Sequence, residues 1–242
     1  MVVAVWVTVN QGYQEPYIWM LFAIEEFCKS LVTMQFVIMV LELRQRFCSL
    51  NADLRLSLPL PCNSEMRGLL CGSSRRLAPA RKLRQLREAH VALARAAEFL
   101  QSHFGWPVAF DVTYCVCGAT CSAYEVLMKT VQPRSIVEFS YSQQPAVSAL
   151  WFAFHTLKLL SVVLSCAATA DEAAATGVFL LRAVVTSDLR CADVEAFLQL
   201  TLHSPPLRFT AAGFVTLDRR LLVSALAAMV TYLVILGQLS SQ

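Results

Sequence analysis

LLVSALAAMVTYLVILGQL, residues 221–239, is the stretch that decides the fold class of this chain. It contains no charged residue and no proline, and an apolar helix of about 20 residues matches the hydrocarbon thickness of a bilayer. The alternative is the central helix of a soluble protein, but soluble helices normally keep one polar face. The whole chain agrees with a membrane location, since 57% of its 242 residues are hydrophobic and only 15% are charged. The sequence therefore predicts an integral membrane protein.

Three weaker apolar stretches precede this one. With the last span they cover residues 16–43, 104–128, 146–168 and 219–239. We therefore predict an all-α, polytopic membrane helical bundle that forms a single transmembrane domain over residues 1–242. The weaker spans carry ionisable side chains: Glu25, Glu26, Lys29, Asp111, His155 and Lys158. Such groups are costly at membrane depth and usually face a bundle interior or a wet cavity.

Two ion pairs are predicted among these groups. Glu25 and Lys29 are four residues apart, with the acid first, which favours a pair along one helix. Asp111 and Lys158 lie in different spans at mid-membrane depth, so we predict that they pair between helices.

The distribution of basic residues predicts the orientation of the spans. Eleven of the twenty Lys and Arg residues lie between residues 44 and 103: Arg44, Arg46, Arg55, Arg67, Arg75, Arg76, Arg81, Lys82, Arg84, Arg87 and Arg95. The next loop, residues 129–145, holds only Lys129 and Arg134. Because cytoplasmic loops carry the excess of Lys and Arg, the first loop should be inside and the C-terminus extracellular. A multi-pass protein of the plasma membrane is expected.

Two segments between the spans are predicted to be amphipathic cytoplasmic helices that anchor the bundle, residues 80–103 and 192–204. In the first, apolar positions recur in steps of three and four and continue into the second span, with Pro107 as a predicted kink. The stripe consists of Leu83, Leu86, His90, Leu93, Ala97, Leu100 and Phe104. The second segment should end at Ser204-Pro205-Pro206, because proline cannot continue a helix.

Several classes of chemistry find no support. The nine cysteines and four histidines lack metal-ligand spacing, so we expect no metal site and no cofactor. No phosphate loop, HExxH motif or nucleophile elbow is present, so no catalytic residue is assigned and an enzyme is not expected. The basic segment lacks interleaved aromatic residues, which argues against nucleic acid as a partner.

Three stretches carry a resemblance to a known family. The C-terminal run from Thr231-Tyr232 to Gln238-Leu239 resembles the signature of insect gustatory receptors: Thr-Tyr, five mostly apolar residues, then Gln-Phe. Phe209-Thr210-Ala211-Ala212-Gly213-Phe214 resembles the stretch that leads into the last helix of that family. Arg46-Phe47 with Leu50-Asn51 resembles the element after its fourth helix.

The resemblance implies a specific architecture and activity. Family members look like tetrameric, ligand-gated, non-selective cation channels of taste neurons, with seven helices, an external C-terminus and a central pore lined by the last helix. The four spans here would correspond to helices four to seven, so the resemblance implies an N-terminally truncated fragment. Its partners would be a sugar or bitter tastant, membrane lipid, and other subunits in a homo- or heterotetramer. The chain departs from the signature at Leu239, where the family has Phe.

Four residues near the C-terminus are candidates for the pore and gate by this resemblance: Gln238, Leu239, Thr231 and Tyr232. The Gln238 amide offers donors and acceptors that can replace part of the hydration of an ion. The simpler interpretation is that Gln238 lies at the membrane interface. The Thr231 hydroxyl is expected to bond to its own helix, and Tyr232 to pack between subunits.

Aromatic and polar residues in the outer half of the spans are candidates for a ligand pocket: Trp19, Phe22, Glu25, Tyr124, Trp151 and His155. Such a mixture suits small sugars or alkaloid-like molecules. Trp151 and His155 are four residues apart, and therefore on one helix face. Ordinary packing or an interfacial belt would explain the aromatic residues equally well.

Two rival functions remain open. A truncated, nonconducting subunit could assemble with full-length relatives and modulate them. Alternatively, an unrelated membrane transporter or membrane enzyme could share only the helix composition.

Overall fold

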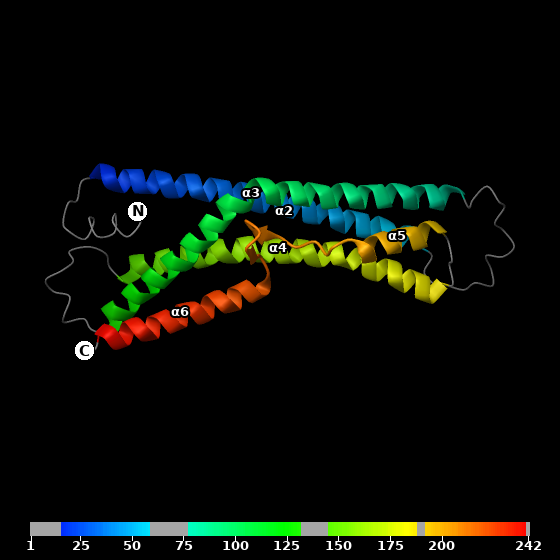
Figure 1. The fold of residues 1–242 in the computed structure, drawn as a ribbon. Coiled ribbons are helices and arrows are strands. Elements are labelled where there is room, and N and C mark those ends of the chain that lie inside the picture. The colour runs from blue at the N-terminus through cyan, green and yellow to red at the C-terminus, as the bar shows by residue number, and fades with distance from the viewer. Residues whose placement is uncertain (1–15, 59–76, 132–144, 188–191, 241–242) are drawn as a thin grey trace. The chain divides into compact units, whose positions relative to one another are not determined.

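The computed structural model describes residues 16–58, 77–131, 145–187 and 192–240 (Figure 1). In chain order its elements are α2 (Pro16–Ser57), α3 (Leu77–Val131), α4 (Pro145–Ser187), α5 (Ala192–His203), β1 (Thr210–Ala211), β2 (Val215–Thr216) and α6 (Arg219–Ser240). The predicted all-α class is confirmed for these residues, apart from two short strands.

The chain divides into two compact units. Unit 1 takes residues 1–35, 106–163 and 219–242, and unit 2 takes residues 36–105 and 164–218. The helices α2, α3 and α4 each contribute one segment to each unit.

The long helix α3 confirms that the amphipathic segment and the second predicted span are continuous. The predicted stripe is its buried side, with Leu83, Leu86, Ala97, Leu100 and Phe104 all buried. The helix continues through Pro107. The predicted kink at this proline falls at the boundary of the two units, so it stays a prediction.

Buried positions on α2 recur every seven residues. They run from Glu26 through Thr33, Val40 and Phe47 to Leu54. A spacing of seven keeps side chains on nearly the same face of a helix, which drifts by only about 20° per heptad. This register decides which polar residues of α2 face inward.

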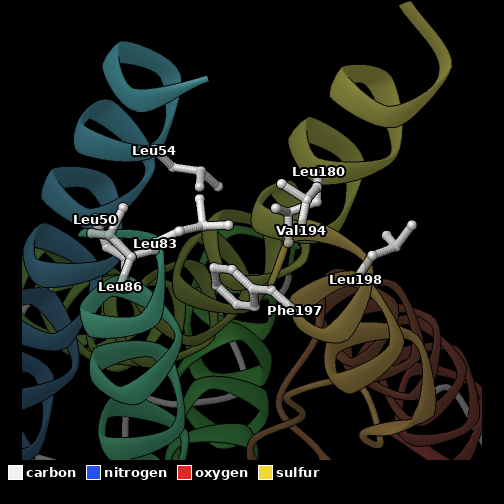
Figure 2. Packing of buried hydrophobic residues seen from close by; sticks show 8 residues of the cluster. All are labelled: Leu50, Leu54, Leu83, Leu86, Leu180, Val194, Phe197 and Leu198. Carbon is white, nitrogen blue, oxygen red and sulfur yellow. The ribbon is translucent and has the colours of Figure 1, made fainter. Parts of the chain in front are cut away.

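A hydrophobic core holds unit 2 together (Figure 2). Segments from α2, α3, α4 and α5 supply it: Leu50, Leu54, Leu83, Leu86, Leu180, Val194, Phe197 and Leu198. In Figure 2 the Phe197 ring of α5 lies among the leucines of the neighbouring helices. Asp193 and Glu195 in the first turn of α5 and His203 in its last turn complement the helix dipole. The helix predicted over residues 192–204 is therefore confirmed, and it ends before Pro205 as expected.

A polar clamp joins α2 to α4 in the same unit. The Asn51 amide donates to the backbone carbonyl of Glu172 at 2.9 Å and to its carboxylate at 2.8 Å. The Asn51 carbonyl accepts a bond of 2.7 Å from the Thr176 hydroxyl. Asn51 and Thr176 are both fully buried, and burying polar groups is tolerated only when they are bonded in this way. The clamp therefore fixes the register of the two helices.

A tight hairpin connects α5 to α6. For this connection the sequence predicts only the end of the preceding helix at Ser204-Pro205-Pro206. Thr210 pairs with Thr216 and Ala211 with Val215. The two central residues, Ala212 and Gly213, have φ of 52° and 80°. Positive φ at both central positions is the geometry of a type I′ turn, which matches the twist of a hairpin.

His90 lies between two aromatic rings in unit 2. Its ring centroid is 5.7 Å from that of Phe47 and 5.8 Å from that of Phe197, both in edge-on geometry. The His90 Nδ1 atom is buried without a hydrogen-bond partner. Burial lowers the pKa of His90 below its ordinary 6.5, because the charged imidazolium is poorly solvated there.

This environment predicts acid sensitivity for unit 2. The unfolded chain protonates His90 at higher pH than the folded chain, so the free energy of unfolding falls as pH drops below 6.5 towards the lowered folded pKa. Above pH 6.5 His90 contributes no pH dependence. Replacing His90 by leucine should remove this part of the slope. Thermal unfolding of purified wild-type and H90L protein between pH 8 and 5 measures the difference. Parallel curves for the two proteins would contradict the prediction.

Two of the described helices are long and apolar enough to cross a membrane. They cover Ala146–Val185 and Arg219–Gln238, and so include the predicted third and fourth spans. The predicted first and second spans lie inside α2 and α3, which do not meet the same measure over the described residues. Four spans therefore remain a prediction. Residues 44–58 and 77–103 of the first basic segment belong mostly to α2 and α3, whereas most of the second loop lies outside the described residues. The orientation therefore stays a prediction too.

Candidate functional site

An aromatic cluster in unit 1 surrounds His155. The Trp151 ring stacks on the imidazole, with centroids 5.7 Å apart and planes at 26°. The rings of Phe154 and Tyr114 approach His155 edge-on at 5.5 and 5.3 Å. His155 is buried, and its Nδ1 has no hydrogen-bond partner. The predicted shared face of Trp151 and His155 is confirmed, and α3 adds Tyr114 to it.

Gly118 makes room for this imidazole. A Cβ atom built on Gly118 would lie 2.7 Å from His155 Nε2 and 2.8 Å from its Cδ2. Real Cβ atoms do not approach that closely, so the ring can pack here only against a glycine. Gly118 therefore sets the position of His155 between α3 and α4.

Replacing Gly118 by alanine should displace the His155 ring. Filling a packed site in this way typically costs about 1–3 kcal/mol of stability. Gly237→Ala is the matched control, because a Cβ there meets no atom within 4 Å and alanine favours the helix. Thermal unfolding of the two variants in detergent compares them. A G118A protein as stable as G237A would mean that the ring has space to move.

Unit 1 also contains a buried ionic network. Lys158 Nζ is 2.7 Å from Asp111 Oδ1 and 3.5 Å from Glu26 Oε1. These contacts join α2, α3 and α4. The Thr33 hydroxyl donates to Asp111 Oδ2 at 2.8 Å. All four side chains are buried. The predicted Asp111–Lys158 pair is therefore confirmed, with Thr33 and Glu26 as additional members.

Glu26 is the incompletely satisfied member of this network. Its Oε1 atom lies 3.5 Å from Lys158 Nζ, and its Oε2 atom is buried without a hydrogen-bond partner. The carboxylate also interacts with Tyr114, electrostatically and through a side-chain hydrogen bond, and electrostatically with His155. The neighbouring Glu25 instead pairs with Lys29 at 2.6 Å on a more exposed part of α2, as predicted.

The terminal helix α6 is mostly exposed in this chain. Only 11% of the stretch Arg219–Gln238 is buried, and its buried residues are Ala225 and Met229. The Thr231 hydroxyl donates to the Ala227 carbonyl of the preceding turn at 2.9 Å, as expected. The side chain of Tyr232 is 60% exposed.

Comparison with known proteins assigns the family. A family model described as 7tm chemosensory receptor matches residues 1–242. The chain belongs to this receptor family. The chain is also similar to "Gustatory receptor for sugar taste 43a" of Drosophila melanogaster, with 29% identity over 158 residues. That match covers 64% of this chain and 35% of the relative, so the chain corresponds to about a third of the length of that protein.

Membership of the chemosensory receptor family confirms the resemblance drawn from the terminal motif. It identifies the chain as a membrane receptor and not an enzyme. The apolar helices α4 and α6 agree with a membrane location.

The residues predicted for the ligand pocket of this receptor fall into three groups. Trp151 and His155 are in direct contact. Phe22 and Tyr124 are half-buried, and Glu25 is engaged with Lys29. The side chain of Trp19 lies outside the described residues, as does that of Leu239 in the predicted pore. Binding and pore roles for all these residues remain predictions.

The structure adds residues that the pocket prediction left out, chiefly Gly118 and Tyr114. Of the two adjacent glutamates of α2, Glu26 is buried and Glu25 is exposed. The seven-residue spacing from Glu26 to Thr33 was the sequence signal for this register, since it places two polar residues on one face of an apolar helix.

Proposed function

We propose that this chain belongs to a gustatory receptor, a ligand-gated, non-selective cation channel subunit that detects small-molecule tastants at the plasma membrane of sensory neurons. The observation that carries the proposal is helix α6. It is long and apolar enough to span a bilayer, it is mostly exposed within the chain, and it carries the Thr-Tyr…Gln motif in a member of the chemosensory receptor family. The exposed surface of such a helix is covered by lipid or by other subunits, and four copies around a central pore would place part of it against neighbouring subunits.

The pore would be formed by α6, with Gln238 at its narrow end. The side chain of Gln238 is exposed in this chain, as a residue that contacts permeating ions must be. The predicted orientation places this end outside the cell. Tyr232 would then pack between neighbouring subunits, which accounts for its exposure here.

The ligand is proposed to bind near the aromatic cluster of Trp151, His155 and Tyr114. A sugar or a bitter compound fits a site with flat apolar faces and a few polar atoms. The name of the Drosophila relative, a receptor for sugar taste, supports the sugar class. Binding would bias the equilibrium between closed and open arrangements of α6.

We further propose that the described helices are helices four to seven of a longer seven-helix subunit, which agrees with the 35% coverage of the relative. The alternative is a nonconducting subunit that assembles with full-length receptors and modulates them. The family assignment argues against an unrelated transporter.

Expression in oocytes, alone and together with a full-length receptor of the family, tests the proposal. Tastant-evoked cation currents that require this chain support the channel subunit. Currents of the full-length receptor that merely shrink or grow in its presence support the modulatory alternative. Absence of both, together with no co-purification of the two proteins, would reject both functions.

A further inference from the structure

The buried network of unit 1 holds one negative charge more than its own cations balance. Its carboxylates are Glu26 and Asp111, and its ammonium group is Lys158. Lys158 is 2.7 Å from Asp111 and 3.5 Å from Glu26, so the surplus charge belongs to Glu26. A buried carboxylate whose charge is only partly compensated is unfavourable, and all the more so in a membrane protein.

One oxygen of the Glu26 carboxylate also lacks a hydrogen-bond partner. Glu26 Oε2 is buried with no hydrogen-bond partner, and its side chain is 7% exposed. His155 Nδ1, on α4, is likewise buried and unpartnered, and the His155 side chain interacts electrostatically with Glu26. A buried polar atom without a partner loses about 1–3 kcal/mol relative to a bonded one. Two such atoms in one cluster point to a ligand that supplies hydrogen-bond donors.

The rings around these atoms already accept cations. Lys29 Nζ lies over the Tyr114 ring, 4.2 Å from its centroid, and Lys158 Nζ lies 6.0 Å from the Phe154 centroid. An ammonium near the faces of aromatic rings is stabilised by their quadrupoles, more strongly when water is excluded. Trp151, the ring that this interaction favours most, stacks on His155 beside the same network.

We propose that Glu26 is the recognition group for a small organic ammonium ligand. The ammonium donates to Glu26 Oε2 and neutralises the surplus charge. A second donor of the ligand reaches His155 Nδ1, which accepts when the proton of the ring is on Nε2. The apolar part of the ligand contacts Trp151 and Tyr114. This inference rests on the proposed function as a tastant receptor, and it narrows the ligand from a sugar or a bitter compound to a cationic amine.

Equilibrium dialysis of the purified receptor in detergent with radiolabelled phenethylammonium tests the proposal without requiring a channel current. The amine is compared at neutral pH with 2-phenylethanol, which has a similar shape but no charge. The wild-type receptor should bind the amine at least about 10-fold more tightly than the alcohol, as a hydrogen bond to a charged group predicts. Equal affinities would overturn the proposal.

Two isosteric variants on the same helix locate the charge. Glu26→Gln should weaken amine binding at least about 10-fold and leave the binding of the alcohol unchanged. Glu42→Gln, the matched control, should leave both unchanged, because Glu42 is exposed and paired with Arg46. If E26Q binds the amine as well as wild type does, the proposal fails.

Thermal unfolding separates loss of the site from loss of the fold. E26Q removes an uncompensated buried charge, so its unfolding temperature without ligand should be at least that of wild type. Excess amine should raise the unfolding temperature of wild type and E42Q but not that of E26Q. A rise of the same size in E26Q would contradict the assignment. Amine binding in a receptor that passes no current would reject only the channel proposal.

Discussion

Replacement of Lys158 by methionine is expected to destabilise the receptor by about 3–5 kcal/mol. The ammonium is 2.7 Å from Asp111 and 3.5 Å from Glu26, and the three side chains are all more than nine-tenths buried. Methionine has a similar length but no charge, so it leaves two buried carboxylates without a cation. The yield of monodisperse protein and its unfolding temperature in detergent measure the loss.

Lys29→Met is the matched control for this prediction. Lys29 is also paired with a glutamate, but Lys29 is only half-buried and Glu25 is exposed, and a pair near the surface contributes only about 0–1 kcal/mol. Exchange of the two charges in a double variant, Asp111→Lys with Lys158→Asp, should recover part of the yield that either single change loses. Similar stability of K158M and K29M, or a double variant no better than the single ones, would show that the buried pair is not the stabilising contact.

Replacement of Leu54 by alanine is expected to cost about 2–5 kcal/mol, because it opens a cavity in the core of unit 2. Leu54 is fully buried among leucines of α2 and α3 and the Phe197 ring (Figure 2). Leu56, two residues further on the same helix, is 82% exposed. Leu56→Ala should therefore change the free energy of unfolding by less than about 0.5 kcal/mol.

The comparison of these two leucines needs only the unfolding temperature of each variant in the same detergent. The difference between them isolates burial, since residue type, helix and sequence neighbourhood are matched. If L56A is as destabilising as L54A, Leu56 is covered in the assembled receptor, and the exposed side of this segment of α2 is an interface.

The sequence predicts the buried side of a helix, an ion pair between helices and the end of a helix, because in each case periodicity, charge or proline allows only one arrangement. The stripe on α3 is apolar every three or four residues, so its buried side follows from helix geometry alone. Asp111 and Lys158 are opposite charges at the same depth of neighbouring spans, and the cost of burial forces them to pair. The end of α5 follows in the same way from Pro205 and Pro206.

Features that depend on contacts between distant segments could not be predicted in this way. The edge-on contacts of His90 join Phe47 and Phe197, which lie in different helices and share no sequence pattern. Gly118 is a small residue in an apolar span, and only the position of His155 shows why it must be glycine. The hairpin after α5 has strands of two residues each, too short for an alternating pattern.

The burial of Glu26 beside the exposed Glu25 illustrates a limit of local reasoning. Adjacent residues on a helix point about 100° apart, so a shift of one position moves a carboxylate from the interior to the surface. The spacing of four residues between Glu25 and Lys29 predicts their ion pair near the surface, but it does not show that Glu26 is buried. The inward register depends on the longer repeat through Thr33 and Val40.

The single-channel conductance of receptors containing this chain, with Gln238 replaced by alanine, tests the central claim most directly. Ser224→Ala is the control, because Ser224 lies on the same helix and its hydroxyl bonds to the Arg220 carbonyl of its own backbone. If α6 lines a cation pore with Gln238 at its narrow end, Q238A should change the unitary conductance or ion selectivity while S224A leaves both unchanged. Currents of Q238A identical to wild type in conductance and selectivity would contradict the assignment of α6 as the pore helix.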